Sequence, residues 1–521
     1  MTTTATVPGG SADTAGTAGA ARGGLANMAG SALAGGTGVA VTWIVARVLG
    51  PAQAGAFFAA TAAFVLLGGL AKLGTGTGLV YWPARLRATG RSHLLGACLR
   101  TGLTPVLVFS LMLAAGMWLA APQIARVTAD DAPHVIAAHT AGLRVLAVFL
   151  PLQALTDVLL TVTRGYRRMR PTVLLDRLLR SGLQLAAVSV AGVATLWLAA
   201  SLPVFACAWA APYLPVAILS GYAARRVYLA GRPPGAGPDR TERRGLRREF
   251  WAFTGPRALA AVAQLALQRV DVLLVAALGG LAPAAVYAVA GRFVVLIQFA
   301  NQGLSQSVQP RLAEALSTGD REAANRLYRT ATGWLVLVTW PICLLVAVCA
   351  PWYLRLFGPE YAAGAPVVRV LAGAMLVATG CGMVDMVLAM AGRTSLNLGN
   401  VLVALAVTIG LDVLLIPRWG ALGAAAGLAC AMVVNNLLPL AQVYRAAGLH
   451  PFGRGTRTAA LLAAGCCGVL PQGAVALLGD GPAVLVPVLT VAVAAYCAGV
   501  WLLRDELALG AFARRSDVED G

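Results

Sequence analysis

Two opposite charges stand inside an apolar stretch of this chain. Arg269 and Asp271 belong to LALQRVDVLLVAAL, residues 265–278, where Gln268 is the one other polar side chain. An Arg or Asp at the centre of a membrane-spanning helix costs roughly 2.5–3.5 kcal/mol on insertion scales, so each needs a partner, a water-filled cavity or a ligand. Residues two apart are separated by about 200° around a helix, so these charges cannot pair within one helix and face different surroundings.

Two interpretations of this pair are open. In the structural one, Asp271 fastens its helix to a neighbouring helix, and Arg269 pairs with an acid such as Asp157 or Asp385. In the functional one, Arg269 faces a cavity and contacts an anionic group of a cargo, while Asp271 orients a basic partner. We favour an Asp271 that faces protein and an Arg269 that faces cargo. Asp271, Asp157 and Asp385 are candidates for a structural acid or for an acid that couples transport to an ion.

Three further basic residues, Lys72, Arg144 and Arg292, also fall within apolar runs. Lys72 belongs to GGLAKLGTGTGL, whose glycines indicate a flexible or closely packed helix, and the GK[ST] part of a phosphate-binding loop is not present. Arg144 and Arg292 lie nearer to helix ends, from which a long side chain can reach the headgroup region. Each of the three is a candidate for the same cavity as Arg269.

One apolar run carries polar uncharged side chains on a single helical face. Gln298, Asn301, Gln302 and Ser305 follow the spacing i, i+3, i+4, i+7, which places them in one sector of a helix. Such a face suits hydrogen bonds to an uncharged, sugar-like cargo. The alternative is hydrogen bonding between helices, which contributes about 0.6 kcal/mol per pair. Gln268, in the same run as Arg269, is another candidate for the cavity. Asn435 and Asn436, in a later run, indicate no more than a kink near Pro439.

The elements that must position these residues are membrane-spanning helices. The chain has 521 residues, of which 59% are hydrophobic and 12% charged, against about 45–50% and 25% in soluble domains. Apolar runs of about 20 residues, enough to cross a bilayer, recur along nearly the whole length and leave no room for a soluble catalytic domain. We predict an all-α polytopic membrane protein with about fourteen spans. The spans are expected at 26–48, 55–80, 96–120, 138–162, 178–199, 202–223, 257–280, 283–309, 331–350, 364–390, 396–416, 420–443, 458–478 and 482–503.

The basic residues orient these spans. With the N-terminus inside, most of the 40 Lys and Arg residues fall in cytoplasmic segments, as the positive-inside rule requires. The outer segments hold Arg47, Arg126, Arg355, Arg369 and Arg418. Both termini are therefore expected in the cytoplasm, with the protein in the plasma membrane. The net charge of +19 is that of loop arginines beside anionic lipids and does not indicate nucleic-acid binding.

Few residues are of the types that catalysis or metal binding needs. The nine cysteines include no CxxC pair and the four histidines no HExxH motif, so we expect neither a metal site nor another cofactor. A membrane glycosyltransferase or polymerase would need catalytic acids or a sizeable outer loop. The longest outer segment offers only Asp130 and Asp131. The protein is therefore not expected to be an enzyme.

The chain divides into two similar halves. Gly50 aligns with Gly279 and Pro83 with Pro310, and six spans in each half predict parallel pseudo-symmetric lobes around a central cavity. Residues 1–24 have no apolar core and are expected to be a disordered cytoplasmic tail. The expected order is this tail, an N-terminal lobe at 25–223, a cytoplasmic linker at 224–256, a C-terminal lobe at 257–445, two extra spans at 446–503 and a cytoplasmic tail at 504–521.

Five stretches of the chain, in order, resemble one family of transporters. They are ARVLGPAQAGAFFA, QRVDVLLVAALGG, PRLAEALSTGD, LFGPEYAAGAPVVRVLAG and LLIPRWGALGAAAGLA. The chain between about 25 and 445 thereby resembles the polysaccharide or O-antigen-type flippases for lipid-linked oligosaccharides, of the multidrug/oligosaccharidyl-lipid/polysaccharide exporter superfamily. The two extra spans resemble that family only in being two additional helices.

The resemblance implies a function. A glycan on an undecaprenyl-type pyrophosphate carrier would move from the cytoplasmic to the outer leaflet by alternating access, with Arg269 as a pyrophosphate contact. Its partners would be the lipid-linked glycan, membrane lipids and other enzymes of envelope glycan assembly. A lipid II flippase of peptidoglycan synthesis is an alternative. So is a multidrug–cation antiporter, which would favour an acidic coupling site, for which Asp157, Asp271, Asp385 and Asp412 are available.

Overall fold

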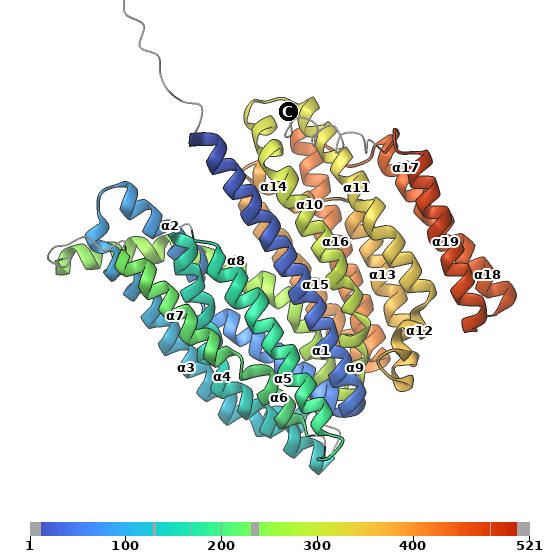
Figure 1. The fold of residues 1–521 in the computed structure, drawn as a ribbon, viewed down its shortest axis with the longest axis horizontal. Helices are drawn as coiled ribbons and strands as arrows, with labels where there is room; N and C mark the ends of the chain where they lie inside the picture. Colours follow the sequence, from blue (N-terminus) through green and yellow to red (C-terminus); the bar gives the residue numbers. More distant parts are fainter. Residues whose placement is uncertain are drawn as a thin grey trace, which may run out of the picture.

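The computed structural model describes residues 12–128, 132–166, 168–199, 201–230, 239–479 and 481–507. The regular structure of these residues is helical throughout, which confirms the all-α prediction (Figure 1). Twelve helical stretches of the described residues are long and apolar enough to cross a membrane. The first of them, Gly30–Ala88, covers the first two expected spans, because the helix resumes directly after a sharp bend at Gly50.

The N-lobe consists of the helices up to α7. They are α1 (Ala12–Ala71), α2 (Thr75–Ala88), η1 (Ser92–Leu94), α3 (Leu95–Thr128), α4 (Pro133–Gly165), the π-helix η2 (Thr172–Arg180), α5 (Ser181–Ala194), α6 (Leu202–Ala210) and α7 (Tyr213–Ala230). The fifth expected span, 178–199, is not among the twelve long apolar stretches. Its α-helical part ends at Ala194, and charged residues of η2 form its beginning.

The C-lobe consists of α8 to α16, and three more helices follow it. The C-lobe elements are α8 (Arg240–Leu278), α9 (Leu281–Ala290), α10 (Arg292–Ser317), α11 (Arg321–Val348), α12 (Ala350–Arg355), η3 (Pro359–Gly364), α13 (Ala365–Gly380), α14 (Val384–Met390), α15 (Thr394–Trp419) and α16 (Ala421–Ala447). The last elements are α17 (Arg454–Ala463), the π-helix η4 (Ala464–Val469), α18 (Leu470–Leu478) and α19 (Pro482–Leu502). They pack against α11 at the edge of the C-lobe (Figure 1).

The two lobes are joined by helix contacts between small residues. α1 packs against α8, α9 and α10. A Cβ atom on Gly55 would lie 1.8 Å from the carbonyl oxygen of Leu281, so only glycine permits this approach of α1 to α9. Small residues at helix contacts are typical of membrane proteins, because packing rather than hydrophobic burial joins helices there.

Helix α8 belongs to both lobes. Its first part packs against α2 and α3, where the rings of Tyr81 and Phe253 stack with their centroids 4.3 Å apart. A Cβ atom on Gly74 would lie 2.6 Å from the Cα atom of Ala258. Its last part packs against α9 and α15. α8 is continuous through Pro256, so a single helix connects the two lobes.

Glycines with positive φ separate the paired spans at equivalent places. Gly50, inside α1, has φ 71° and ψ 172°, and Gly280, between α8 and α9, has φ 89° and ψ 172°. The sequence alignment placed Gly50 opposite Gly279, whose φ is −116°. The structural equivalent of Gly50 is therefore Gly280, because the turn requires a glycine with a positive φ and Gly279 does not have one.

The described parts of the tail and of the linker are largely helical. α1 begins at Ala12, so residues 12–24 are helical rather than disordered, consistent with their alanine content, while residues 1–11 lie outside the described part. The expected linker is largely helical as well. Only 231–238 lie outside the description, and a capping box of Asp239 and Glu242 begins α8 directly after them.

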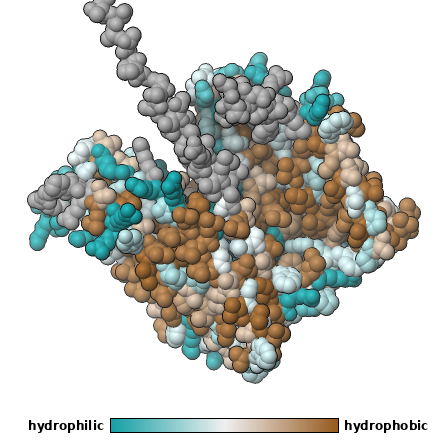
Figure 2. Space-filling view, viewed as in Figure 1, coloured by the Kyte–Doolittle hydropathy of each residue, from teal (hydrophilic) through white to brown (hydrophobic). Residues whose placement is uncertain are grey.

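The outside of the bundle is apolar. Figure 2 shows brown, hydrophobic residues across the middle of the visible face, with teal residues mostly gathered toward its ends. Trp197 and Leu477, each 86% exposed, belong to a long series of exposed large apolar side chains, and a continuous apolar surface of this kind would make a protein aggregate in water. The protein is therefore a multi-pass membrane protein, with these side chains facing lipid.

Candidate functional site

Two cavities lie next to each other inside the bundle. The inter-lobe cavity, of about 230 Å³, is lined by α1, η2, α5 and α6 from the N-lobe and by α8, α9 and α10 from the C-lobe. The C-lobe cavity, of about 390 Å³, is lined by C-lobe helices, including α8, α10, α13 and α16. Both are lined by Arg269, Val272, Ala288 and Arg292. The two arginines thus lie at the boundary between the cavities.

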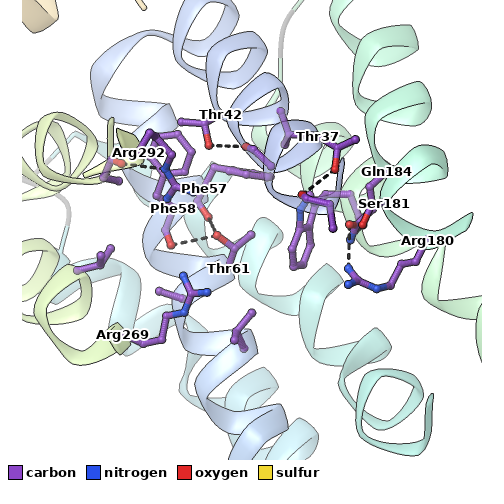
Figure 3. A pocket seen from close by; sticks show the side chains of 18 residues that line it. Thr37, Thr42, Phe57, Phe58, Thr61, Arg180, Ser181, Gln184, Arg269 and Arg292 are labelled. Atoms are coloured by element: carbon purple, nitrogen blue, oxygen red, sulfur yellow. Dashed lines mark hydrogen bonds between the residues drawn. The ribbon is translucent and has the colours of Figure 1, made fainter. Parts of the chain in front are cut away.

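The lining of the inter-lobe cavity is basic and hydroxyl-rich. Arg180 and Gln184 lie at one end of it and Arg269 and Arg292 at the other (Figure 3). Its hydroxyl groups belong to Thr37, Thr42, Thr61 and Ser181. No Asp or Glu of the described residues belongs to this lining. The cavity therefore offers a positive, hydrogen-bonding environment, which attracts an anion.

Arg180 was not predicted as a site residue. It is the last residue of the π-helix η2, and its Nε atom lies 2.8 Å from a carboxylate oxygen of Asp176. Its guanidinium also donates to Gln184, at 2.9 Å, and lies over the ring of Tyr213. From hydropathy alone, Arg180 counts among the basic residues of the cytoplasmic segments. The signal that could have found it is the i, i+4 pair with Gln184 at the start of an apolar run.

Arg269 and Arg292 lack acidic partners. Nε of Arg292 donates to the carbonyl oxygen of Ala288 at 3.0 Å. Nε of Arg269 is buried without a hydrogen-bond partner in the described part of the chain. No ion pair found there joins either arginine to an acid, so the pairing of Arg269 with Asp157 or Asp385 that the structural interpretation allowed is not observed.

Asp271 faces protein. It is 5% exposed, and the hydroxyl group of Tyr287, on α9, donates a hydrogen bond to its carboxylate. The backbone N–H of Val272 donates to the same group at 2.9 Å. Asp271 therefore fastens α8 to α9, and its partner is a tyrosine rather than the basic residue of the functional interpretation.

A second buried acid, Asp412 on α15, lies close enough to interact electrostatically with Asp271. Both carboxylate oxygens of Asp412 are buried, and neither has a hydrogen-bond partner among the residues that the structure describes. A Cβ atom on Gly427, in α16, would lie 2.3 Å from one of them. From the sequence, Asp412 was an available acid without a role. Its position beside Asp271 depends on the packing of α15, which no spacing within α15 reveals.

Lys72 lies at a break in a helix and not in either cavity lining. α1 ends at Ala71, and Leu73 has a φ of 49°, the only positive φ of a non-glycine residue in the described ranges. Nζ of Lys72 lies 2.9 Å from a carboxylate oxygen of Asp157 on α4, with the two side chains 35% and 30% exposed. The prediction of a cavity-facing Lys72 is therefore replaced by an ion pair that ties this break to α4.

The remaining predicted residues divide between the C-lobe cavity and other places. The guanidinium of Arg144 lies over the ring of Trp118, at 5.5 Å, and Arg144 lines neither cavity. Gln302 and Ser305 line neither cavity either. Those that line the C-lobe cavity are Gln268, Gln298, Asn301 and Asp385. The predicted wall is shorter than its spacing suggested. At about 100° per residue, Ser305 lies between Gln298 and Asn301 in angle, so the cavity ends along α10 before it reaches Ser305.

Additional amides complete the lining of the C-lobe cavity. Gln264 comes from α8, and Asn435 and Asn436 come from α16. α16 runs without interruption from Ala421 to Ala447, so the two asparagines do not mark a break in the helix. Two adjacent amides in an apolar run indicate a position that faces a cavity. From the sequence alone, Asn435 and Asn436 were interpreted as a kink instead.

One family model matches the chain in two segments. The MatE model matches residues 28–176 and 256–417. These segments begin and end close to the two lobes, and together they cover more than half of the chain. No curated protein sequence matches the chain.

Several solved transporters share the fold. The chain is similar to the lipid II flippase MurJ in an inward closed conformation, with a TM-score of 0.69, 11% identity, and coverage of 91% of this chain and 98% of that one. It is similar to an inward-facing multidrug resistance MATE family transporter, with a TM-score of 0.66, 15% identity, and coverage of 79% and 94%. A transporter of the MOP superfamily from Pyrococcus furiosus has a TM-score of 0.55, 16% identity, and coverage of 82% and 95%. At these identities the likeness shows the fold alone.

Proposed function

Since the chain belongs to the MatE family of membrane transporters, we propose that it moves a lipid-linked oligosaccharide or polysaccharide precursor on an undecaprenyl-type diphosphate from the cytoplasmic to the outer leaflet. It acts by alternating access of a central cavity. The observation that carries the proposal is the inter-lobe cavity, where Arg269 and Arg292 have no acidic partner among the described residues and no Asp or Glu belongs to the described lining. The chain is a transporter and not an enzyme.

A diphosphate suits this cavity chemically. A guanidinium group binds phosphate oxygens through two parallel hydrogen bonds, and these charge-assisted bonds are about twice as strong as neutral ones. Arg269 and Arg292 have no acid to bind instead within the described ranges, so an anionic ligand supplies the neutralisation that the protein does not. The hydroxyl groups of Thr37, Thr42 and Thr61 add donors, while the polyprenyl tail of such a cargo can stay in the lipid.

The same cavity disfavours an antiporter of cationic drugs. Two arginines without acidic partners would repel a cation, whereas a multidrug–cation antiporter needs a pocket that accepts one. A lipid II flippase stays a second candidate, because its cargo offers the same diphosphate to the arginines, and the fold similarity to MurJ extends over 91% of the chain. The glycan attached to the diphosphate distinguishes this candidate from the first.

Asp271 and Asp412 are the acids that we propose for energy coupling. The carboxylate of Asp412 is buried without a hydrogen-bond partner in the described residues, and such a group favours the uptake of a proton. Asp157 is already neutralised by Lys72, and Asp385 lines the C-lobe cavity. The proposed setting is the plasma membrane, with both termini in the cytoplasm and with enzymes of envelope glycan assembly as partners.

The test is a leaflet-transfer assay in liposomes with a fluorescent polyprenyl-diphosphate-oligosaccharide. We expect transfer by the wild-type protein and a loss of about tenfold in Arg269→Ala, since one charge-assisted contact is worth roughly 1.5–3 kcal/mol. Arg418→Ala is the matched control, because Arg418 is exposed at the end of α15 and lines neither cavity. No transfer of several such glycans, together with proton-coupled efflux of a cationic dye, would overturn the proposal.

A further inference from the structure

The two cavities offer different chemistry on the two sides of Arg269 and Arg292. Apart from these arginines and Arg180, the inter-lobe cavity is lined mainly by hydroxyl groups and by apolar side chains such as Phe57 and Val65. Beside apolar side chains such as Leu371 and Met432, the C-lobe cavity is lined by amide side chains on three helices. They are Gln264 and Gln268 on α8, Gln298 and Asn301 on α10, and Asn435 and Asn436 on α16. A molecule held by the two boundary arginines therefore meets two different surroundings.

The amide lining fits a polyhydroxylated ligand. Each Asn or Gln side chain presents one acceptor and two N–H donors, so it can bond hydroxyl and acetamido groups in either direction. Oδ1 of Asn301 is buried and has no hydrogen-bond partner within the described ranges. A buried acceptor without a partner costs stability, and a ligand that donates to it removes that cost. The cavity volume, about 390 Å³, lies within the range of roughly 300–1,000 Å³ typical of ligand pockets.

The charge of the C-lobe cavity limits the ligand further. Asp385 lines this cavity and is exposed, and no ion pair of Asp385 is found among the described residues. Asp271 also lines it but is held by Tyr287. Away from the boundary arginines, the polar groups of the cavity are thus mainly amides and a carboxylate, beside the hydroxyl groups of Tyr287 and Thr379. An anionic group there would be repelled, whereas an uncharged one would not.

We propose that the C-lobe cavity holds the sugar attached directly to the diphosphate, and that this sugar is uncharged. The proposal rests on the proposed function. In a polyprenyl-diphosphate-glycan the diphosphate separates the lipid from the first sugar, so a diphosphate at Arg269 and Arg292 directs its two substituents away from each other. The amide-lined side takes the sugar, and Asp385 discriminates against a uronic acid at this position.

The experiment compares three cargoes in the liposome assay. They are polyprenyl diphosphate without sugar, the same lipid with N-acetylglucosamine, and the same lipid with glucuronic acid. Asn301→Leu and Gln298→Leu should lower transfer of the N-acetylglucosamine cargo about fivefold, which corresponds to one lost hydrogen bond, and should leave the sugar-free cargo unchanged. Gln302→Leu is the matched control, because Gln302 lies on the same helix outside the cavity lining. Unchanged transfer of the sugar-free cargo also shows that each variant is folded.

The charge of the sugar gives a second comparison. Wild-type protein should transfer the glucuronic acid cargo at least about fivefold more slowly than the N-acetylglucosamine cargo, and Asp385→Asn should reduce that difference. Equal rates for the two sugars in the wild type would overturn the proposal. So would equal losses with and without sugar in Asn301→Leu.

Failure of the proposed function has a different signature. If the wild type transfers none of the cargoes, their binding in detergent, measured by quenching of tryptophan fluorescence, still tests the sugar contact. Tighter binding of the N-acetylglucosamine cargo than of the sugar-free cargo, lost in Asn301→Leu but not in Gln302→Leu, would support the C-lobe site without transport. Sugar-independent binding would overturn it.

Discussion

Two basic residues of the N-lobe and two of the C-lobe differ in what neutralises them. In the N-lobe, Lys72 pairs with Asp157 at 2.9 Å and Arg180 with Asp176 at 2.8 Å. In the C-lobe, Arg269 and Arg292 have no acid within ion-pair distance in the described residues. All four lie within or beside apolar helices.

This difference separates charges that stabilise the fold from charges that are available to bind a ligand. Removing one member of a buried ion pair leaves the other charge uncompensated and destabilises a protein. Removing an unpaired arginine from a cavity removes a charge that was already costly. Stability and transport should therefore respond in opposite ways to substitutions in the two lobes.

The largest expected effect is on transport in the C-lobe. The double substitution Arg269→Gln and Arg292→Gln should lower transfer of a lipid-diphosphate glycan by more than about 100-fold, because two charge-assisted contacts of roughly 1.5–3 kcal/mol each are lost. The melting temperature should not fall. Transfer in liposomes and thermal unfolding in detergent measure the two. A lower melting temperature with intact transfer would mean that these arginines are structural and would erase the contrast between the lobes.

The substitution Tyr287→Phe tests whether a charged residue of the C-lobe that does have a partner, Asp271, contributes to stability. The hydroxyl group of Tyr287 is bonded to buried Asp271, and its removal should lower stability by about 1–3 kcal/mol, the cost of leaving a buried acceptor without its donor. Denaturant-induced unfolding in detergent measures this. Tyr353→Phe is the matched control, because it removes a tyrosine hydroxyl from a neutral acceptor, the carbonyl oxygen of Val289. An unchanged stability in Tyr287→Phe would mean that Asp271 finds its partner elsewhere.

The N-lobe ion pair should show a smaller and purely structural effect. Lys72→Met leaves Asp157 unpaired and should cost about 1 kcal/mol, a modest amount because both side chains are about one-third exposed. Adding Asp157→Leu should restore part of the loss. Thermal unfolding of the two single variants and the double variant gives the coupling between them. If stability is unchanged and transfer is lost, Lys72 acts on the cargo and the contrast between the lobes fails.

The smallest effect is expected outside the membrane, at the start of α8. Hydrogen bonds from the Thr241 hydroxyl group and the Arg240 backbone lower the pKa of Asp239, and a bond from the Asp239 backbone lowers the pKa of Glu242. Because both pKa values are lower in the folded chain, the cap stabilises the helix at neutral pH and is lost as the pH falls below about 4. Amide hydrogen exchange in the first turn of α8 should then increase. Faster exchange along all of α8 would instead indicate general unfolding.

Much of the fold follows from the sequence because its signals are local. Apolar runs of the length of a bilayer predict spans, and the angle between Arg269 and Asp271 on one helix predicts that they face different surroundings. The structure has Asp271 buried against Tyr287 and Arg269 at two cavities. The partner of Asp271 lies 16 residues away on another helix, which the period of α8 does not reveal.

The features that were not predicted depend on contacts between distant segments. Lys72 and Asp157 are 85 residues apart, and nothing in either segment specifies that they pair. Arg180 lies where a span begins, and whether such a residue faces water or a cavity depends on the helices around it. The polar wall was predicted on the right helix but with the wrong length, because periodicity gives the face of a helix and not how far a cavity extends along that face.

The continuity of α8 has a mechanical consequence. In its first half this helix is packed against the N-lobe through Phe253 and Ala258, and in its second half it carries Arg269 to the boundary of both cavities. A continuous helix of this kind acts as a lever. When the lobes part at its N-lobe end, the guanidinium in its second half must shift with it unless the helix bends. Opening toward one side of the membrane and loosening the hold on an anion are then one movement rather than two events in sequence.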